Sequence, residues 1–252
     1  MTDTLINFYE LKKVKKYCKD LPDTQHEKTS MKLNKPHILC CGSTGSGKSC
    51  GFLMNYIFRT SNTFAKIIFI CEKDEPLIEY LKEKIPKYLE VHLGIDNLPD
   101  ISTFPDSCKL KEPKRYLLIF DDQIVALMKS KTNQVKVNNY FMYGRNKGIQ
   151  CVFLTQSYYA TPKFIRLNVS YTILCSIRSK NDLRMILNEY NVSLLSQDDM
   201  YEIWKYCSTL QNGESFSFMK IATFHTALNK KISRNFLEYI KLEDFKDEED
   251  SD

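Results

Sequence analysis

The sequence lacks the features typical of membrane-spanning and disulfide-stabilised proteins. It has no apolar run of about 18 residues, so we expect no transmembrane helix, and its N-terminus lacks the apolar segment of a signal peptide. The nine cysteines form no C-x-x-C pair and several lie inside apolar runs. The four histidines do not lie near cysteines at ligand spacing. We therefore predict buried thiols in a reducing compartment, with neither disulfides nor a zinc site.

Charge is unevenly distributed along the chain. The 252 residues carry a net charge of +5, but the last ten hold seven acids and one lysine, which leaves +11 on the remainder. A basic body with an acidic tail suits a nucleic-acid partner, and it equally suits a solvated surface with a disordered tail. With 43% hydrophobic and 27% charged residues, the chain can bury a large core. We predict an N-terminal helix and linker over 1–30, one domain over 31–240 and an acidic, disordered tail over 241–252.

The segment His37–Ser49 reads HILCCGSTGSGKS, an apolar strand that enters a glycine-rich turn. Its last eight residues fit G-x-x-x-x-G-K-[ST], the P-loop or Walker A motif, at every fixed position. The glycines permit positive φ angles and bring backbone N–H groups close to an anion, and the following helix points its positive end at the same place. We therefore predict a nucleoside-triphosphate site. Its phosphate-binding residues are Gly42, Ser43, Thr44, Gly45, Ser46, Gly47, Lys48 and Ser49.

Apolar strand-like runs alternate with segments of helical spacing after this loop, which indicates an α/β fold with a parallel sheet. The expected strands are 66–71, one near Val91, 116–120, 151–155, 171–177 and a late strand or hairpin over 216–223. The expected helices are 49–60, 76–84, one ending near Gly144, 182–190 and 198–207. Ligands in such folds gather at the carboxyl ends of the strands.

Two of these strand ends carry further polar residues. Asp121 and Asp122 follow the run LLIF and have the form of a Walker B pair. The first carboxylate would hold Mg²⁺ and the second would activate water, although an Asp-Asp turn at a strand end is also common. Gln156 ends the next strand, where an amide can sense the γ-phosphate. Arg145 precedes that strand and is either an arginine that acts on a neighbouring subunit's nucleotide or an ordinary surface residue.

A GTPase is excluded because the sequence lacks two of its elements. The stretch Ser179–Asp182 approximates the guanine-reading N-K-x-D element, but serine stands where asparagine is required. No glycine follows Asp121 at the spacing of a D-x-x-G motif.

Four segments between about residues 32 and 190 together resemble the FtsK–HerA superfamily, and within it the DNA-packaging ATPases of nucleocytoplasmic large DNA viruses and virophages. They are GSTGSGKS (42–49), LLIFDD (117–122), YGRNKGIQCVFLTQS (143–157) and IRLNVSYTILCSIRSKNDLRMI (165–186). The most distinctive features are the G-R-x₉-T-Q arrangement and the I-R-x-N segment after it, which we interpret as a strand.

The resemblance implies a P-loop NTPase in which an additional strand lies between the strands of the two Walker motifs. It implies that Lys48 and Ser49 bind phosphate and Mg²⁺, that Asp121 holds the metal, and that Asp122 activates water. By the same resemblance Gln156 senses the γ-phosphate and Arg145 acts on a neighbouring subunit. It further implies a homo-oligomeric ring of six or five subunits, with double-stranded DNA and a capsid portal vertex as partners. The setting would be the viral factory in the host cytoplasm, and the virion.

Our main hypothesis is therefore an ATP-driven motor that moves double-stranded DNA into a viral particle and contacts phosphates without reading sequence. The stretch Lys129–Lys136 is a candidate DNA-facing loop. Two alternatives remain open at this point: a small-molecule or nucleoside kinase that uses the same loop, and a non-catalytic nucleotide-binding scaffold. The competing arginines for the role of Arg145 are Arg166, Arg178 and Arg184.

Overall fold

A computed structural model describes Lys12 and residues 25–34, 37–190, 195–211, 213–225 and 228–245. Nearly all of the expected N-terminal helix and most of the acidic tail lie outside these residues. In the described part of residues 1–30, Gln25–His26 (β1) pairs in antiparallel fashion with Met31–Lys32 (β2), a hairpin that the sequence did not predict. Within the described ranges, no helix is both long enough and apolar enough to span a membrane.

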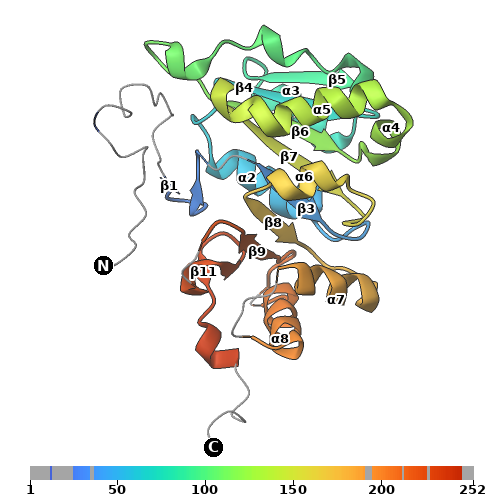
Figure 1. Cartoon of the computed structure of the whole chain (residues 1–252), viewed down its shortest axis with the longest axis vertical. Helices are drawn as coiled ribbons and strands as arrows, with labels where there is room; N and C mark the ends of the chain where they lie inside the picture. The colour runs from blue at the N-terminus through green and yellow to red at the C-terminus, as the bar shows by residue number, and fades with distance from the viewer. Residues whose placement is uncertain are drawn as a thin grey trace, which may run out of the picture.

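The core of the protein is a nine-stranded sheet with the order β11-β10-β9-β8-β3-β7-β6-β4-β5. Its strands are β3 (Ile38–Cys41), β4 (Lys66–Cys71), β5 (Leu89–Leu93), β6 (Tyr116–Asp121), β7 (Ile149–Thr155), β8 (Tyr171–Leu174), β9 (Met219–Ala222), β10 (Ile232–Arg234) and β11 (Glu238–Tyr239). All neighbours from β8 to β5 pair in parallel. The last three strands extend the sheet in antiparallel fashion. Figure 1 shows the sheet running from β5 at one end of the molecule towards β11 at the other.

The α-helices of the described residues are α2 (Met54–Arg59), α3 (Pro76–Lys84), α4 (Ile124–Lys129), α5 (Lys131–Tyr143), α6 (Lys163–Asn168), α7 (Lys180–Glu189) and α8 (Gln197–Ser208). A π-helical segment, η2 (Lys48–Leu53), leads directly into α2, so the predicted helix over 49–60 is confirmed. Short 3₁₀ turns occur at η3 (Ile95–Asn97), η4 (Ile101–Thr103), η5 (Ser107–Lys109), η6 (Gly144–Lys147), η7 (Leu228–Lys230) and η8 (Leu242–Phe245).

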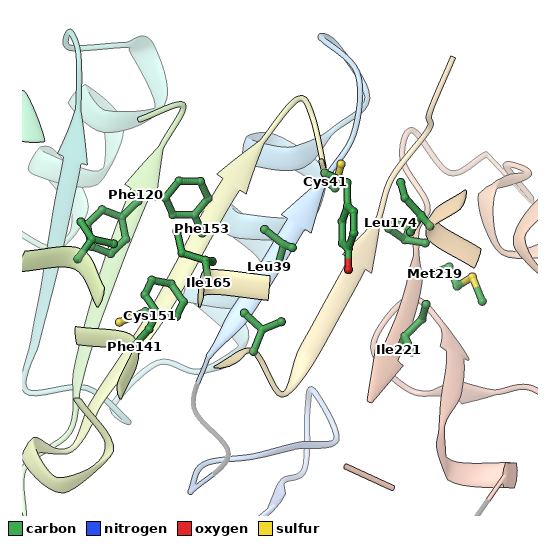
Figure 2. Packing of buried hydrophobic residues seen from close by; sticks show 14 of the residues in the cluster. Leu39, Cys41, Phe120, Phe141, Cys151, Phe153, Ile165, Leu174, Met219 and Ile221 are labelled. Carbon is green, nitrogen blue, oxygen red and sulfur yellow. The ribbon is translucent and has the colours of Figure 1, made fainter. Parts of the chain in front are cut away.

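Each buried strand contributes to two cores because successive side chains point to opposite faces of a sheet. In β7, Cys151 and Phe153 join the core covered by α4 to α8, whereas Val152 and Leu154 join the core under η2, α2 and α3. Figure 2 shows the first of these cores, where Phe120, Phe141 and Phe153 meet beneath the helices. Burial on both faces explains why these strands are continuous apolar runs.

Two local predictions were wrong. The stretch Lys129–Lys136 is not a loop, because it comprises the end of α4 and the first turns of α5, whose N-terminus is capped by the Ser130 side chain. The segment Ile165–Asn168 is not a strand but most of the short helix α6, which buries Ile165 against the core (Figure 2). Both segments are too short for sequence periodicity to separate helix from strand or loop.

The expected additional strand is present. β7 lies between β3, which carries the P-loop, and β6, which ends in the paired acids. This order brings the carboxyl ends of β3, β7 and β6 to one edge of the sheet.

Candidate nucleotide site at the carboxyl edge of the sheet

The P-loop connects β3 to η2 and takes the backbone shape that its glycines allow. Gly45 and Gly47 have φ angles of 78° and 90°, in the left-handed region that favours glycine. The Gly51 and Phe52 N–H groups both donate to the carbonyl of Gly47, at 2.7 and 2.9 Å, so the helix begins directly after the loop. Its N-terminus therefore faces the loop, as an anion site requires.

Lys48 folds over the loop. Its Nζ donates to the carbonyl oxygens of Gly42 and Ser43 at 2.8 and 3.1 Å. The loop is fastened to its neighbours by the Gly42 N–H, which donates to the Thr155 carbonyl at 3.1 Å, and by the Ser43 N–H, which donates to the Ser176 carbonyl at 3.0 Å. These bonds anchor the P-loop to β7 and to the segment after β8. Lys48 lies over this anchored loop, in a position to bind phosphate.

A chain of two hydrogen bonds links the P-loop to the paired acids. Thr44 Oγ1 donates to Gln156 Oε1 at 2.9 Å, and Gln156 Nε2 donates to Asp122 Oδ2 at 2.6 Å. Asp122 has a φ of 53°, unusual for a non-glycine residue, and this turns it out of the strand direction. Three residues from three different strand ends thus meet at the place where sequence analysis expected the γ-phosphate.

Asp121 has a different environment from Asp122. Its pKa is raised to about 6, first by burial and then by the nearby carboxylates of Glu75 and Asp122, against the lowering effect of Lys48. Ser49, Glu75 and Asp121 line one small cavity. A hydroxyl beside two carboxylates is a hard-oxygen donor set that suits Mg²⁺.

Magnesium fits this site better than a metal that requires a full protein cage. In the described part of the chain, no group of three or more His, Cys, Asp or Glu side chains is arranged to hold a metal ion. Mg²⁺ does not need such a group, because it keeps several waters and takes one or two carboxylates together with substrate phosphates. Ser49 and Asp121 are the residues that would hold it.

Arg145 does not belong to the site of its own subunit. It lies in η6, directly before β7, whereas Gln156 follows the last residue of that strand. The seven residues of β7 span about 20 Å. Arg145 therefore lies near the amino end of β7, whereas the P-loop lies at the carboxyl ends of the parallel strands. Its guanidinium therefore lies away from the P-loop of its own chain.

The competing arginines have different surroundings. The Arg166 Nη1 donates to both carboxylate oxygens of Glu189, at 2.8 and 2.9 Å. The guanidinium of Arg166 lies over the rings of Tyr158 and Tyr159. Arg178 lies beside the P-loop, where its backbone N–H donates to Ser43 Oγ at 3.1 Å. Of the candidates, Arg178 is therefore the one in contact with the P-loop of its own chain.

Two residues near the site were missed in the sequence. Glu75 follows β4 by four residues in the acidic stretch EKDE, but nothing in its spacing links it to Asp121. Phe216 packs against Gly47 of the P-loop and Gly51 of η2 from a segment more than 160 residues away. Both contacts depend on the order of the strands in the sheet, which the sequence does not display.

The sequence matches the family of Poxvirus A32 proteins over residues 23–215. The chain belongs to this family. Its members are viral genome-packaging ATPases, so the relationship to viral DNA-packaging ATPases and the ATPase function expected from the motifs are confirmed, and the kinase and scaffold alternatives lose their support. Membership also implies a virus-infected cell and virion assembly as the setting.

Solved structures support the same fold. The DNA-packaging ATPase B204 from Sulfolobus Turreted Icosahedral Virus is 15% identical with a TM-score of 0.52, and the match covers 82% of this chain and 98% of that one. The AMP complex of B204 from Sulfolobus turreted icosahedral virus 2 has 15% identity and a TM-score of 0.50, over 82% and 99% of the chains. No curated protein matches the sequence.

Secretion ATPases share the fold over a smaller part of their length. The cytoplasmic domain of the type VII secretion ATPase EccC from Thermomonospora curvata is 14% identical with a TM-score of 0.56. That match covers 88% of this chain but only 30% of EccC. At these identities the structural likeness shows the mainly parallel P-loop fold alone, and the expected fold class is confirmed.

Proposed function

We propose that this protein hydrolyses ATP with Mg²⁺ at the edge of the sheet formed by β3, β7 and β6, and that hydrolysis drives double-stranded DNA into a viral capsid. The observation that carries the proposal is the hydrogen-bonded chain from Thr44 through Gln156 to Asp122. It joins the loop that would bind the triphosphate to the carboxylate that would activate water. A movement of Thr44 can therefore be transmitted through Gln156 to Asp122, and a movement of Asp122 can be transmitted back to Thr44.

In the proposed reaction, the P-loop amides and Lys48 bind the β- and γ-phosphates. Asp122 accepts a proton from the attacking water as its oxygen bonds to the γ-phosphorus, and the bond to the bridging oxygen breaks to release ADP and phosphate. Gln156 holds Asp122 in place and lies close enough to report the γ-phosphate. Magnesium, held by Ser49 and Asp121, would neutralise charge on the phosphate oxygens.

We further propose that the active form is a ring of six or five subunits. Arg145 is exposed and lies near the amino end of β7, remote from its own P-loop. The helices that precede it, α4 and α5, carry five exposed apolar side chains, which are Val125, Met128, Val135, Met142 and Tyr143. A second copy of the chain packed against these helices would cover such side chains and bring Arg145 towards a neighbouring site.

DNA would be bound through its phosphates, without sequence reading, because a packaging motor has to accept any sequence. The net charge of +11 outside the last ten residues supports an anionic partner. The lysines of 129–136 lie on α4 and α5 and stay candidates for phosphate contacts. A portal vertex of the capsid would be the docking partner, in the cytoplasmic viral factory and in the virion.

The test is ATP hydrolysis by the purified full chain, with and without duplex DNA, over a series of salt concentrations. We expect duplex DNA to stimulate hydrolysis and the stimulation to disappear at high salt, because phosphate contacts release counterions. Lys48→Ala serves as the inactive control. Transfer of phosphate to an added nucleoside instead of water, or a rate that ignores DNA at every salt concentration, would contradict the proposal.

A further inference from the structure

Phe216 lies directly against the P-loop and the first turn of its helix. A Cβ atom on Gly51 would stand 2.6 Å from the Phe216 Cβ, and one on Gly47 would stand 2.9 Å from its Cγ. Contacts under 3 Å are too short for a methyl group, so the Phe216 side chain in this position leaves no room for a Cβ atom on either glycine. At Gly47 the positive φ angle also favours glycine, whereas Gly51 lies within the helical segment η2.

The ring lies on the side of the P-loop away from the catalytic side chains. In the sheet, β7 and β6 lie on one side of β3 and carry Gln156 and the paired acids at their ends. β8 and β9 lie on the other side, and Phe216 precedes the first residue of β9 by three residues. A triphosphate whose γ-phosphate points to Gln156 and Asp122 therefore extends its nucleoside end towards Phe216.

The surroundings of the ring leave room for a planar ligand. Phe216 is 40% exposed although its side chain lies against two glycines. A cleft beside it is lined by Gly51, Asn55, Glu214, Ser215 and Asn235. Arg234 and Asn235 hydrogen-bond the Glu214 carboxylate, which fixes the wall of this cleft opposite the helix.

We propose that the exposed face of Phe216 is the platform on which the nucleobase of the bound nucleotide stacks. The inference rests on the proposed function, since it presumes that the P-loop holds a nucleoside triphosphate. An aromatic ring accepts any base by stacking, so the platform would hold ATP and GTP alike. Truncation of a stacking aromatic weakens binding on the order of 10–100-fold.

The experiment compares two ligands of the same P-loop, a non-hydrolysable ATP analogue and inorganic tripolyphosphate, each titrated with Mg²⁺ into the full-length protein by calorimetry. For the wild type we expect the nucleotide to bind more tightly than tripolyphosphate. Phe216→Leu should lose roughly 10–100-fold in affinity for the nucleotide and less than about 2-fold for tripolyphosphate. Phe216→Tyr should keep both affinities, and Phe58→Leu, at an aromatic 44% exposed on α2, is the matched control.

Three outcomes would overturn the platform. The first is a Phe216→Leu variant that binds the nucleotide as tightly as the wild type does. The second is an equal loss of affinity for both ligands in that variant, which would show that the ring only shapes the loop. The third is equal affinity of the wild type for the nucleotide and for tripolyphosphate. This result would show that the nucleobase contributes nothing to binding, and it would leave the proposed function intact. Failure of the wild type to bind either ligand would instead contradict the proposed function itself.

Discussion

Gln156 donates a hydrogen bond to Asp122 at 2.6 Å while its other amide atom accepts one from the P-loop residue Thr44. The amide group thus has a fixed orientation, with its oxygen towards the loop and its nitrogen towards the carboxylate. Because the donor and acceptor ends of an amide are different, only glutamine in this orientation satisfies both partners. The site is organised around this one side chain, and the first predictions test it.

Asp122→Asn should remove the proton acceptor and leave the volume of the side chain almost unchanged. We expect ATP turnover to fall by about 10²–10⁴-fold, with nucleotide affinity largely unchanged. Single-turnover hydrolysis and equilibrium binding would measure the two quantities separately. Loss of binding with an unchanged rate for the bound nucleotide would refute the role of Asp122 in water activation.

Gln156→Ala should lower kcat by about 10²-fold because it removes both hydrogen bonds at once. Thr44→Val, a change of similar volume without the hydroxyl, should also lower kcat, whereas Thr44→Ser should retain most of it. If Thr44 acts through Gln156, the double variant will be no slower than Gln156→Ala alone. Fully additive effects would show that the two residues act independently.

Asp121→Asn should stabilise the nucleotide-free protein while it abolishes Mg²⁺-dependent nucleotide binding. The pKa of Asp121 is raised to about 6, above its unfolded value near 3.8, so the folded state binds the proton more tightly between these values. The stability of the folded state therefore decreases as pH rises from about 4 to 6, and at pH 7 the ionised group costs about 1–3 kcal/mol. The asparagine variant avoids this cost.

Thermal unfolding at pH 7 without nucleotide would measure the gain, and Glu83→Gln at an exposed position of α3 is the control. The difference between Asp121→Asn and the wild type should shrink at pH 4. A variant less stable than the wild type at pH 7 would refute the assigned environment of Asp121.

Arg145→Ala should lower ATP turnover by about 10³-fold without a change in nucleotide affinity, because the guanidinium would act only on the transition state of a neighbouring site. Mixing this variant with Lys48→Ala tests the arrangement directly. Mixed rings contain some interfaces where one subunit supplies Lys48 and its neighbour supplies Arg145. Activity of the mixture above that of either variant is expected, and its absence at every mixing ratio would contradict action between subunits.

His37 should make the protein less stable in mild acid. Its side chain is 4% exposed, burial lowers its pKa to about 3, and its Nδ1 accepts a hydrogen bond from the Cys151 N–H at 3.2 Å. An unfolded histidine takes up a proton near pH 6.5, so the free energy of unfolding falls as pH decreases from about 6.5 to 3. The largest slope from this one group is about 1.4 kcal/mol per pH unit.

Denaturant unfolding of wild type and His37→Gln between pH 7 and 4 would isolate this contribution as a difference between the two curves. His225→Gln is the control, because that side chain is only half-buried and its lowered pKa should contribute less. Parallel curves for wild type and His37→Gln would show that His37 does not titrate between the two states.

The sequence by itself determined which polar residues stand at the carboxyl ends of β3, β6 and β7, and it indicated most of the helices and strands. The glycine loop, the acids after LLIF and the glutamine after CVFLT are local patterns, and buried parallel strands are readable as apolar runs. Helices α3, α7 and α8 could likewise be predicted from their spacing and caps, within a residue or two. Segments such as 129–136 and 165–168 were misassigned because a run of a few residues carries too little periodicity.

The tertiary structure alone decided which of these residues meet. Placing β7 between β3 and β6 brings Gln156 between Thr44 and Asp122, and the length of the same strand separates Arg145 from the P-loop of its own chain. The antiparallel strands β9 to β11 bring Phe216 against Gly47 and Gly51. Pairing between distant strands depends on the whole packed sheet and not on neighbouring residues, so it leaves no periodic trace in the sequence.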